Sequence, residues 1–97
     1  MILPYFFTGG YIDNEGRKVK VSGHYELTFI DLDGQKYLIP SEDLISSKFP
    51  KSIALYSDNI KNKVTNKPVE LDKRKIILSH VSRILRRYKF HVEIIGL

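Results

Sequence analysis

The residues best suited to acid–base or metal chemistry in this 97-residue chain are three histidines, His24, His80 and His91. They fall in three different predicted elements. None has the i, i+4 spacing, or the His-Glu-x-x-His pattern, that places two histidines on one helix face around zinc. His80 lies about 60° outside the apolar stripe of the helix predicted below, which is typical of a residue at the rim of a core. The chain has no cysteine, which excludes disulfides and thiolate metal sites. These patterns predict no metal site and no cofactor.

Neighbouring polar residues that resemble catalytic pairs have simpler explanations. Asp31 and Asp33 flank a predicted hairpin turn, where aspartate side chains accept backbone hydrogen bonds, and turn chemistry explains them better than paired-carboxylate catalysis. Ser57 and Asp58 are adjacent, but no Gly-x-Ser-x-Gly elbow presents a nucleophile. We therefore predict that the protein is not an enzyme.

Charge is distributed unevenly along the chain. The net charge is +5. Residues 1–43 carry four basic and seven acidic side chains, a net charge of −3, whereas residues 44–97 carry twelve basic and four acidic side chains, a net charge of +8. A chain polarised in this way is suited to meeting RNA or an acidic protein surface through its C-terminal half.

One segment, residues 71–88, has a clear helical period. Asp72 is the predicted N-cap, because its carboxylate can accept hydrogen bonds from free N–H groups of the first turn. Leu71 and Ile76 occupy the positions of a hydrophobic staple around it. The apolar stripe recurs with a period near 3.6 and comprises Ile77, Leu78, Val81, Ile84, Leu85 and Tyr88. The pattern predicts a helix that covers a sheet.

The opposite side of this helix is basic. The candidate contact residues are Lys75, Arg83, Arg86, Arg87 and Lys89. Cations in the last turn suit the negative end of the helix dipole, but the run at residues 73–75 in the first turn does not. The face is either a solvated charged surface or a docking surface for an acidic partner.

Alternating apolar residues predict strands before and after the helix. The predicted strands cover residues 3–8, 17–22, 25–30, 36–39, 53–56 and 90–95. An Asp-Leu-Asp-Gly turn at 31–34 joins two of them in a hairpin, and residues 40–43 lead either a short helical turn or a further strand. We predict an α+β fold in a single domain, 1–97, with a twisted, mainly antiparallel sheet of about five or six strands. One long helix in the C-terminal half packs on one face of this sheet.

The N-terminal segment is not a convincing signal peptide. The apolar start, residues 1–7, is short and lacks a basic region before it. No run approaches the roughly 18–20 apolar residues of a membrane span. The absence of cysteine is compatible with the reducing cytoplasm. We therefore expect a cytoplasmic protein with no membrane partner.

The order of elements resembles a known family. A hairpin on an Asp-Gly turn (29–39) leads to Ser41-Glu42, then to an aromatic strand ending in a Tyr-x-Asp-x-Ile pattern (56–60). A polar loop, a capped helix and a closing strand (90–95) follow. Over residues 28–96 this resembles the immunity protein 74 family, small bacterial proteins that neutralise toxins of polymorphic and contact-dependent growth inhibition systems. The chain departs from that pattern at Lys63, where a tryptophan is expected, and at Ser41, where a glycine is expected.

The resemblance implies a non-catalytic, cytoplasmic protein that binds one cognate toxin tightly. Charge offers two surfaces for this contact. The first is the basic helix face, because arginine is suited to forked recognition of carboxylates. If the toxin is a nuclease with a basic cleft, the acidic N-terminal half offers another: Glu26, Asp31, Asp33, Glu42 and Asp43.

The alternative is a small basic nucleic-acid-binding module. Its helix would contact phosphates, and exposed Tyr11, Tyr25 or Tyr37 would stack on bases. No signature of sheet-based RNA binders accompanies these tyrosines. A third possibility is a subunit-interaction domain whose basic face is only solvated.

Overall fold

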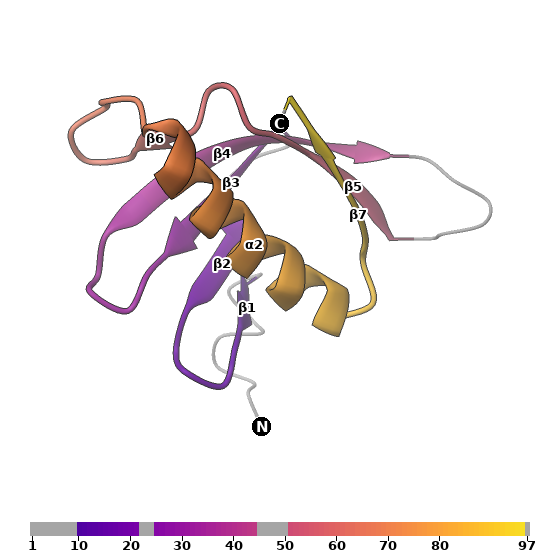
Figure 1. Ribbon diagram of the computed structural model, residues 1–97. Helices are drawn as coiled ribbons and strands as arrows, with labels where there is room; N and C mark the ends of the chain where they lie inside the picture. The colour runs from indigo at the N-terminus through magenta and orange to yellow at the C-terminus, as the bar shows by residue number, and fades with distance from the viewer. Residues whose placement is uncertain (1–9, 22–24, 45–50, 97) are drawn as a thin grey trace.

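The computed structural model of the protein describes residues 10–21, 25–44 and 51–96. Within them the chain forms a curled, mainly antiparallel sheet with one 17-residue helix across one face (Figure 1). The elements are β1 (Gly10–Ile12), β2 (Lys18–Val21), β3 (Glu26–Ile30), β4 (Lys36–Leu44), β5 (Ser52–Tyr56), β6 (Lys61–Asn62), α2 (Leu71–Arg87) and β7 (His91–Ile95). The predicted α+β class and the single long helix in the C-terminal half are confirmed.

The strands follow the order β1-β2-β3-β4-β5-β7. Neighbours from β1 to β5 are antiparallel, as short hairpin connections require, whereas β5 and β7 are parallel. Parallel neighbours need a crossover, and α2 provides it, because the chain leaves β5, passes through α2 and returns in β7. The C-terminal part of the chain, from β5 onward, is therefore a β-α-β unit, and it shares β5 with a five-stranded antiparallel meander.

Strand β4 connects the two parts of this sheet. Its first residues pair with β3, in a register from Ile30↔Lys36 to Glu26↔Pro40. Its last four pair with β5, from Ser41↔Leu55 to Leu44↔Ser52. From the sequence, residues 40–43 were expected to form either a helical turn or a further strand. The structure shows a strand that continues through Leu44. Pro40 is compatible with it because it lies where pairing changes from β3 to β5.

Two turns set the hairpins that face the helix. In the β3–β4 turn Gly34 has φ 85°, a left-handed conformation that favours glycine, and its N–H donates to Asp31 O at 3.0 Å. In the β1–β2 turn Gly16 has φ 108° for the same reason. The predicted hairpin over 29–39 is confirmed.

The core lies between the helix and one face of the sheet. Five apolar side chains of α2 are no more than 1% exposed: Ile77, Leu78, Val81, Ile84 and Leu85. They join a cluster with sheet residues that alternate along their strands, such as Leu27 with Phe29 and Tyr37 with Ile39. Burying each large side chain contributes roughly 1.5–3 kcal/mol. The predicted apolar stripe is confirmed, with Tyr88 packed against its edge.

The predicted start of the helix is wrong. Leu71 is already helical, the N-cap is Glu70, and Glu70 makes no side-chain capping hydrogen bond. Asp72 instead lies in the first turn, where its charge still suits the helix dipole. The connection fixes this start, because Val69 N–H donates to Ile60 O at 3.0 Å and Val69 packs on the core. Leu71 and Ile76 are 45% and 52% exposed and form no staple.

The remaining expectations have mixed outcomes. The predicted strands at 17–22, 53–56 and 90–95 are present as β2, β5 and β7. The predicted polar loop at 60–68 contains a short strand, β6, which pairs with the first half of β4 and was not foreseen. The predicted strand at 3–8 lies outside the described residues.

Candidate partner-binding surface

The predicted basic residues of α2 lie on one exposed side of the helix. At about 100° between successive residues, Lys75, Arg86, Arg83 and Arg87 fall within one sector of about 120°. All four are exposed. Lys89 follows the helix end, is also exposed, and has φ 75°, so it belongs to the turn that leads into β7. The structure therefore brings four of the five predicted residues onto one helical face and places the fifth at its end.

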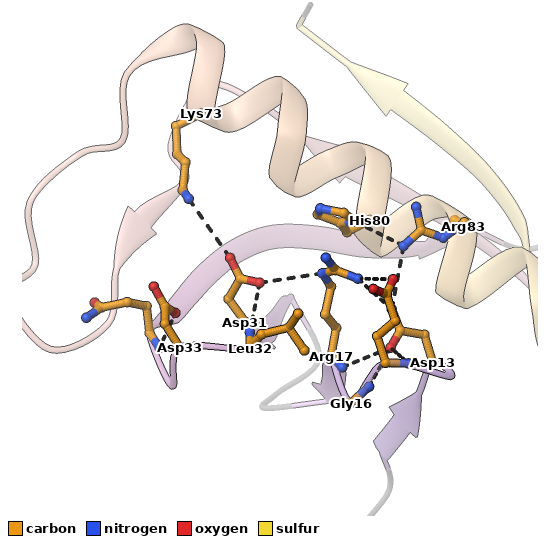
Figure 2. A network of polar contacts seen from close by, with 11 residues as sticks. Asp13, Gly16, Arg17, Asp31, Leu32, Asp33, Lys73, His80 and Arg83 are labelled. Atoms are coloured by element: carbon orange, nitrogen blue, oxygen red, sulfur yellow. Dashed lines mark hydrogen bonds and ion pairs between the residues drawn. The ribbon is translucent and has the colours of Figure 1, made fainter.

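Arg83 is held in place by one neighbour in the β1–β2 turn and one on its own helix (Figure 2). Its Nη2 lies 3.5 Å from Asp13 Oδ2 in the β1–β2 turn. The same Nη2 lies 3.0 Å from His80 Nδ1, one turn earlier on α2. The Arg83 side chain is still 54% exposed. It is thus oriented by two contacts while its outer part remains accessible.

Asp13 is the centre of the polar cluster in Figure 2. Its Oδ1 accepts hydrogen bonds from the backbone N–H groups of Glu15, Gly16 and Arg17, at 2.8–2.9 Å. Its Oδ2 lies 3.3 Å from Arg17 Nη1. Burial alone would raise the pKa of Asp13, but these hydrogen bonds outweigh it and lower the pKa below its ordinary value. Asp13 therefore stays ionised and neutralises charge beside the helix.

Asp31 performs a similar role nearer the start of α2. Its carboxylate lies 3.5 Å from Arg17 Nε and 3.9 Å from Lys73 Nζ. The β1–β2 turn, the β3–β4 turn and the helix are therefore joined by one chain of alternating charges, which runs from Lys73 through Asp31, Arg17 and Asp13 to Arg83 (Figure 2). This chain was not predicted. The only local signal was Asp13 at the first position of a polar turn.

His80 lies between this cluster and the core. Its ring stacks on Phe29, with centroids 6.0 Å apart and planes 13° apart. Burial, followed by the nearby cations Arg17 and Arg83, lowers the pKa of His80. The neutral ring can then accept the Arg83 hydrogen bond at Nδ1. The expected position of His80 at the rim of the core is confirmed.

The other basic residues have fewer partners. Arg86 Nη2 donates to Val92 O in β7 at 3.4 Å. Lys75 and Arg87 make no hydrogen bond or ion pair with the part of the chain that the structure describes. The exposed sector of α2 therefore contains three cations, Lys75, Arg86 and Arg87, that have no carboxylate partner among the described residues.

The alternative acidic residues do not form one surface. Asp31 and Asp33 lie in the β3–β4 turn, where Asp33 Oδ1 accepts the Gln35 N–H at 3.0 Å. Glu42 and Asp43 lie near the far end of β4, and Glu42 accepts the Tyr56 hydroxyl at 2.6 Å. Glu26 pairs with Pro40 between these two places. The five residues are spread along β3 and β4, and Asp31 is already paired with cations.

The tyrosines considered for base stacking are divided between environments. Tyr37 is 7% exposed, belongs to the core and lies beneath Lys73, whose Nζ is 5.7 Å from its ring centroid. Tyr11 packs against Tyr88 and Phe90, with centroids 4.8 and 5.6 Å apart. Tyr25 is 71% exposed. Tyr11 and Tyr37 are therefore engaged in packing.

A cavity of about 320 Å³ lies near the C-terminal end of α2. Its lining includes Tyr11, Asp43, Lys51, Leu85 and Phe90. Burial, with the charge of Asp43 as a second cause, raises the pKa of Tyr11, so its hydroxyl stays protonated. No local sequence pattern predicts this cavity, because its walls come from segments far apart in the chain.

The chain was compared with protein families, curated proteins and solved structures, and none of them matches it. Across the described residues, no helix has the length and apolar character needed to cross a membrane. In the same residues no three His, Asp or Glu side chains form a group that could hold a metal ion.

Proposed function

We propose that this protein is a binding protein of the immunity type, which binds a partner protein through the basic face of α2. The observation that carries the proposal is the grouping of Lys75, Arg83, Arg86 and Arg87 on one exposed helical sector. A structural helix needs no such arrangement, since cations confined to its last turn would satisfy the dipole. The partner surface is expected to be acidic.

Orientation of the arginines supports a protein contact. Arg83 is held by Asp13 and His80, and Arg86 by the Val92 carbonyl. Side chains that are already oriented lose less conformational entropy on binding, and a guanidinium can pair with a carboxylate through two parallel hydrogen bonds. The engagement of Tyr11 and Tyr37 in packing weakens the alternative of base stacking on the sheet.

The order of elements over residues 28–96, which resembles the immunity protein 74 family, supports a toxin as this partner. In that role the protein blocks the toxin by covering its active site or the path of its substrate. The proposal places it in the cytoplasm of the bacterium that makes the toxin, with no catalysis of its own.

The first test is a pull-down of the tagged protein from its native lysate, with and without nuclease, followed by mass spectrometry. A single stoichiometric protein that survives nuclease treatment is the expected result. Recovery of RNA, with protein lost after nuclease treatment, would support the nucleic-acid-binding module instead.

The captured protein then serves in a charge-reversal comparison. Arg86→Glu with Arg87→Glu alters the α2 face, and Asp33→Lys with Glu42→Lys alters the acidic set at exposed positions. We expect the first pair to weaken binding at least about tenfold, which corresponds to about 1.4 kcal/mol, and the second pair to leave it unchanged. The reverse pattern would move the contact to the acidic residues.

A further inference from the structure

Strand β7 lies at the end of the sheet (Figure 1). It pairs in parallel with β5 from Ser52↔His91 to Tyr56↔Ile95. Among the residues that the structure describes, no strand pairs with its other side. An edge of this kind presents a row of backbone donors and acceptors to any extended chain that reaches it.

Two hydrogen bonds define which backbone groups of β7 face outward. His91 N–H donates to Lys51 O at 2.7 Å, and Ser57 N–H donates to Ile95 O at 2.9 Å. Since alternate residues of a strand direct their backbone groups to the same side, His91, Glu93 and Ile95 all face β5. The N–H and C=O groups of Val92 and Ile94 therefore point away from the sheet. Arg86 occupies Val92 O, while no described residue occupies the outward groups of Ile94.

Two exposed side chains at this edge are apolar, one on each face of the strand, and the exposed Glu93 shares its face with Ile95. Ile94 is 37% exposed and Ile95 is 43% exposed. Natural edges are usually protected by charged side chains, proline or a bulge, and along His91–Ile95 the strand carries one charged residue of this kind, Glu93, on the face opposite the helix. An added strand would cover Ile94 on the helix side and Ile95 on the opposite side.

Charge identifies the occupant. The basic sector of α2 borders the edge on the helix side, and Arg86 already reaches across to Val92. A second copy of the chain would bring a further net charge of +5 against this sector. A segment with carboxylates on the helix side would pair with Arg86 and place its other side chains over Ile95.

We propose that the outer edge of β7 binds an extended, acidic segment of the partner protein as an additional strand. The main-chain hydrogen bonds form at Val92 and Ile94, and the Arg86 guanidinium pairs with a carboxylate of the added segment. This inference rests on the proposed function and names how the partner is held.

The test uses residue-resolved amide hydrogen exchange with a short synthetic peptide of alternating valine and glutamate. The matched control replaces glutamate by lysine in the same peptide. We expect the glutamate peptide to slow exchange at Ile94 and Val92 at least about tenfold, and the lysine peptide to have no effect. Unchanged exchange at Ile94 with both peptides would overturn the proposal. Concentration-dependent protection of Ile94 without peptide would show that a second copy is the occupant, which also overturns it.

Ile94→Pro separates the backbone contact from the side chain. It removes the outward N–H, and proline is tolerated where that group faces solvent on an edge strand. Ile94→Ala keeps the N–H and is the matched control. We expect binding to be lost in Ile94→Pro and largely kept in Ile94→Ala, with thermal unfolding confirming that both fold. Equal binding by the two variants would contradict strand addition.

The same variants distinguish this inference from the proposed function. If Arg86→Glu with Arg87→Glu weakens binding of the captured partner but Ile94→Pro does not, the α2 contact stands and strand addition fails. If Ile94→Pro abolishes binding of the captured partner while the arginine reversals leave it unchanged, the backbone contact at β7 stands, and the α2 contact fails together with the Arg86–carboxylate pair.

Discussion

The two flanks of α2 carry similar cations in different surroundings. On the flank that faces the turns, Lys73 and Arg83 meet Asp31 and Asp13, and the Asp13 side chain is only 7% exposed. On the flank that faces β7, Arg86 contacts only a carbonyl oxygen, at 3.4 Å. The first flank is an internal ion-pair network that fastens the helix to two hairpins, whereas the second has charge without a partner carboxylate. The difference teaches that one flank of a helix can be tied into the fold by ion pairs while the other flank keeps a cation without a carboxylate partner among the described residues.

The first prediction concerns Asp13, the centre of the ion-pair network on the flank of α2 that faces the turns. Asp13→Ala deprives three backbone N–H groups and two arginines of their acceptor, so we expect stability to fall by about 2–4 kcal/mol in urea unfolding. Because the folded pKa of Asp13 is lowered, its contribution is present above pH 3.8 and is lost as the pH falls through the folded value. In the Asp13→Ala variant, the loss of stability that comes from protonation of Asp13 at acid pH should be absent. Glu15→Ala is the control, since Glu15 is exposed and its removal costs only its 2.8 Å pair with Arg17 Nη1.

The second prediction concerns Arg83. Arg83→Ala removes one cation from Asp13, which keeps Arg17 and its backbone donors. The loss of stability should be about 1 kcal/mol or less, because the side chain is 54% exposed. Thermal unfolding measures it. A loss as large as that of Asp13→Ala would mean that the network acts as one unit.

The third prediction uses the pH dependence of His80. Its folded pKa is lowered, so the unfolded chain binds a proton first as the pH falls below 6.5. His80 therefore contributes stability above pH 6.5, which is lost as the pH falls through the folded pKa. His80→Gln should flatten this part of the stability profile between pH 8 and 5, within about 1 kcal/mol. An unchanged profile would show that the ring is equally easy to protonate when folded.

The smallest effect on stability is expected for Arg86, on the flank of α2 that faces β7. Arg86→Ala loses one long hydrogen bond to a carbonyl, so thermal and urea unfolding should match the wild type within about 0.5 kcal/mol. A cost near that of Arg83→Ala would assign Arg86 to the structural network and break the comparison between the flanks.

Local chemistry was readable from the sequence. The turn at Gly34 needs a residue with a left-handed backbone conformation, which glycine supplies. The apolar stripe from Ile77 to Leu85 repeats with the period of a helix and with no other period. The hairpin and the helix were therefore both predicted correctly. The exposed position of the basic residues of α2 followed from the same stripe.

Contacts between distant parts of the chain could not be predicted from the sequence in the same way. The helix starts before Asp72 because Val69 is bound to Ile60, and a capping pattern alone does not reveal that bond. The Asp13–Arg83 pair joins residues seventy positions apart, so no local spacing signals it. The open edge of β7 depends on strand order, since the same alternating sequence would be covered in the middle of a sheet.

The most direct measurement is the affinity of the captured partner protein for the Arg86→Glu, Arg87→Glu variant, by titration calorimetry, with its thermal unfolding recorded beside it. The account predicts a loss of at least about tenfold in affinity with an unchanged melting temperature. Wild-type affinity in a variant that folds normally would contradict the assignment of the basic face of α2 as the binding surface.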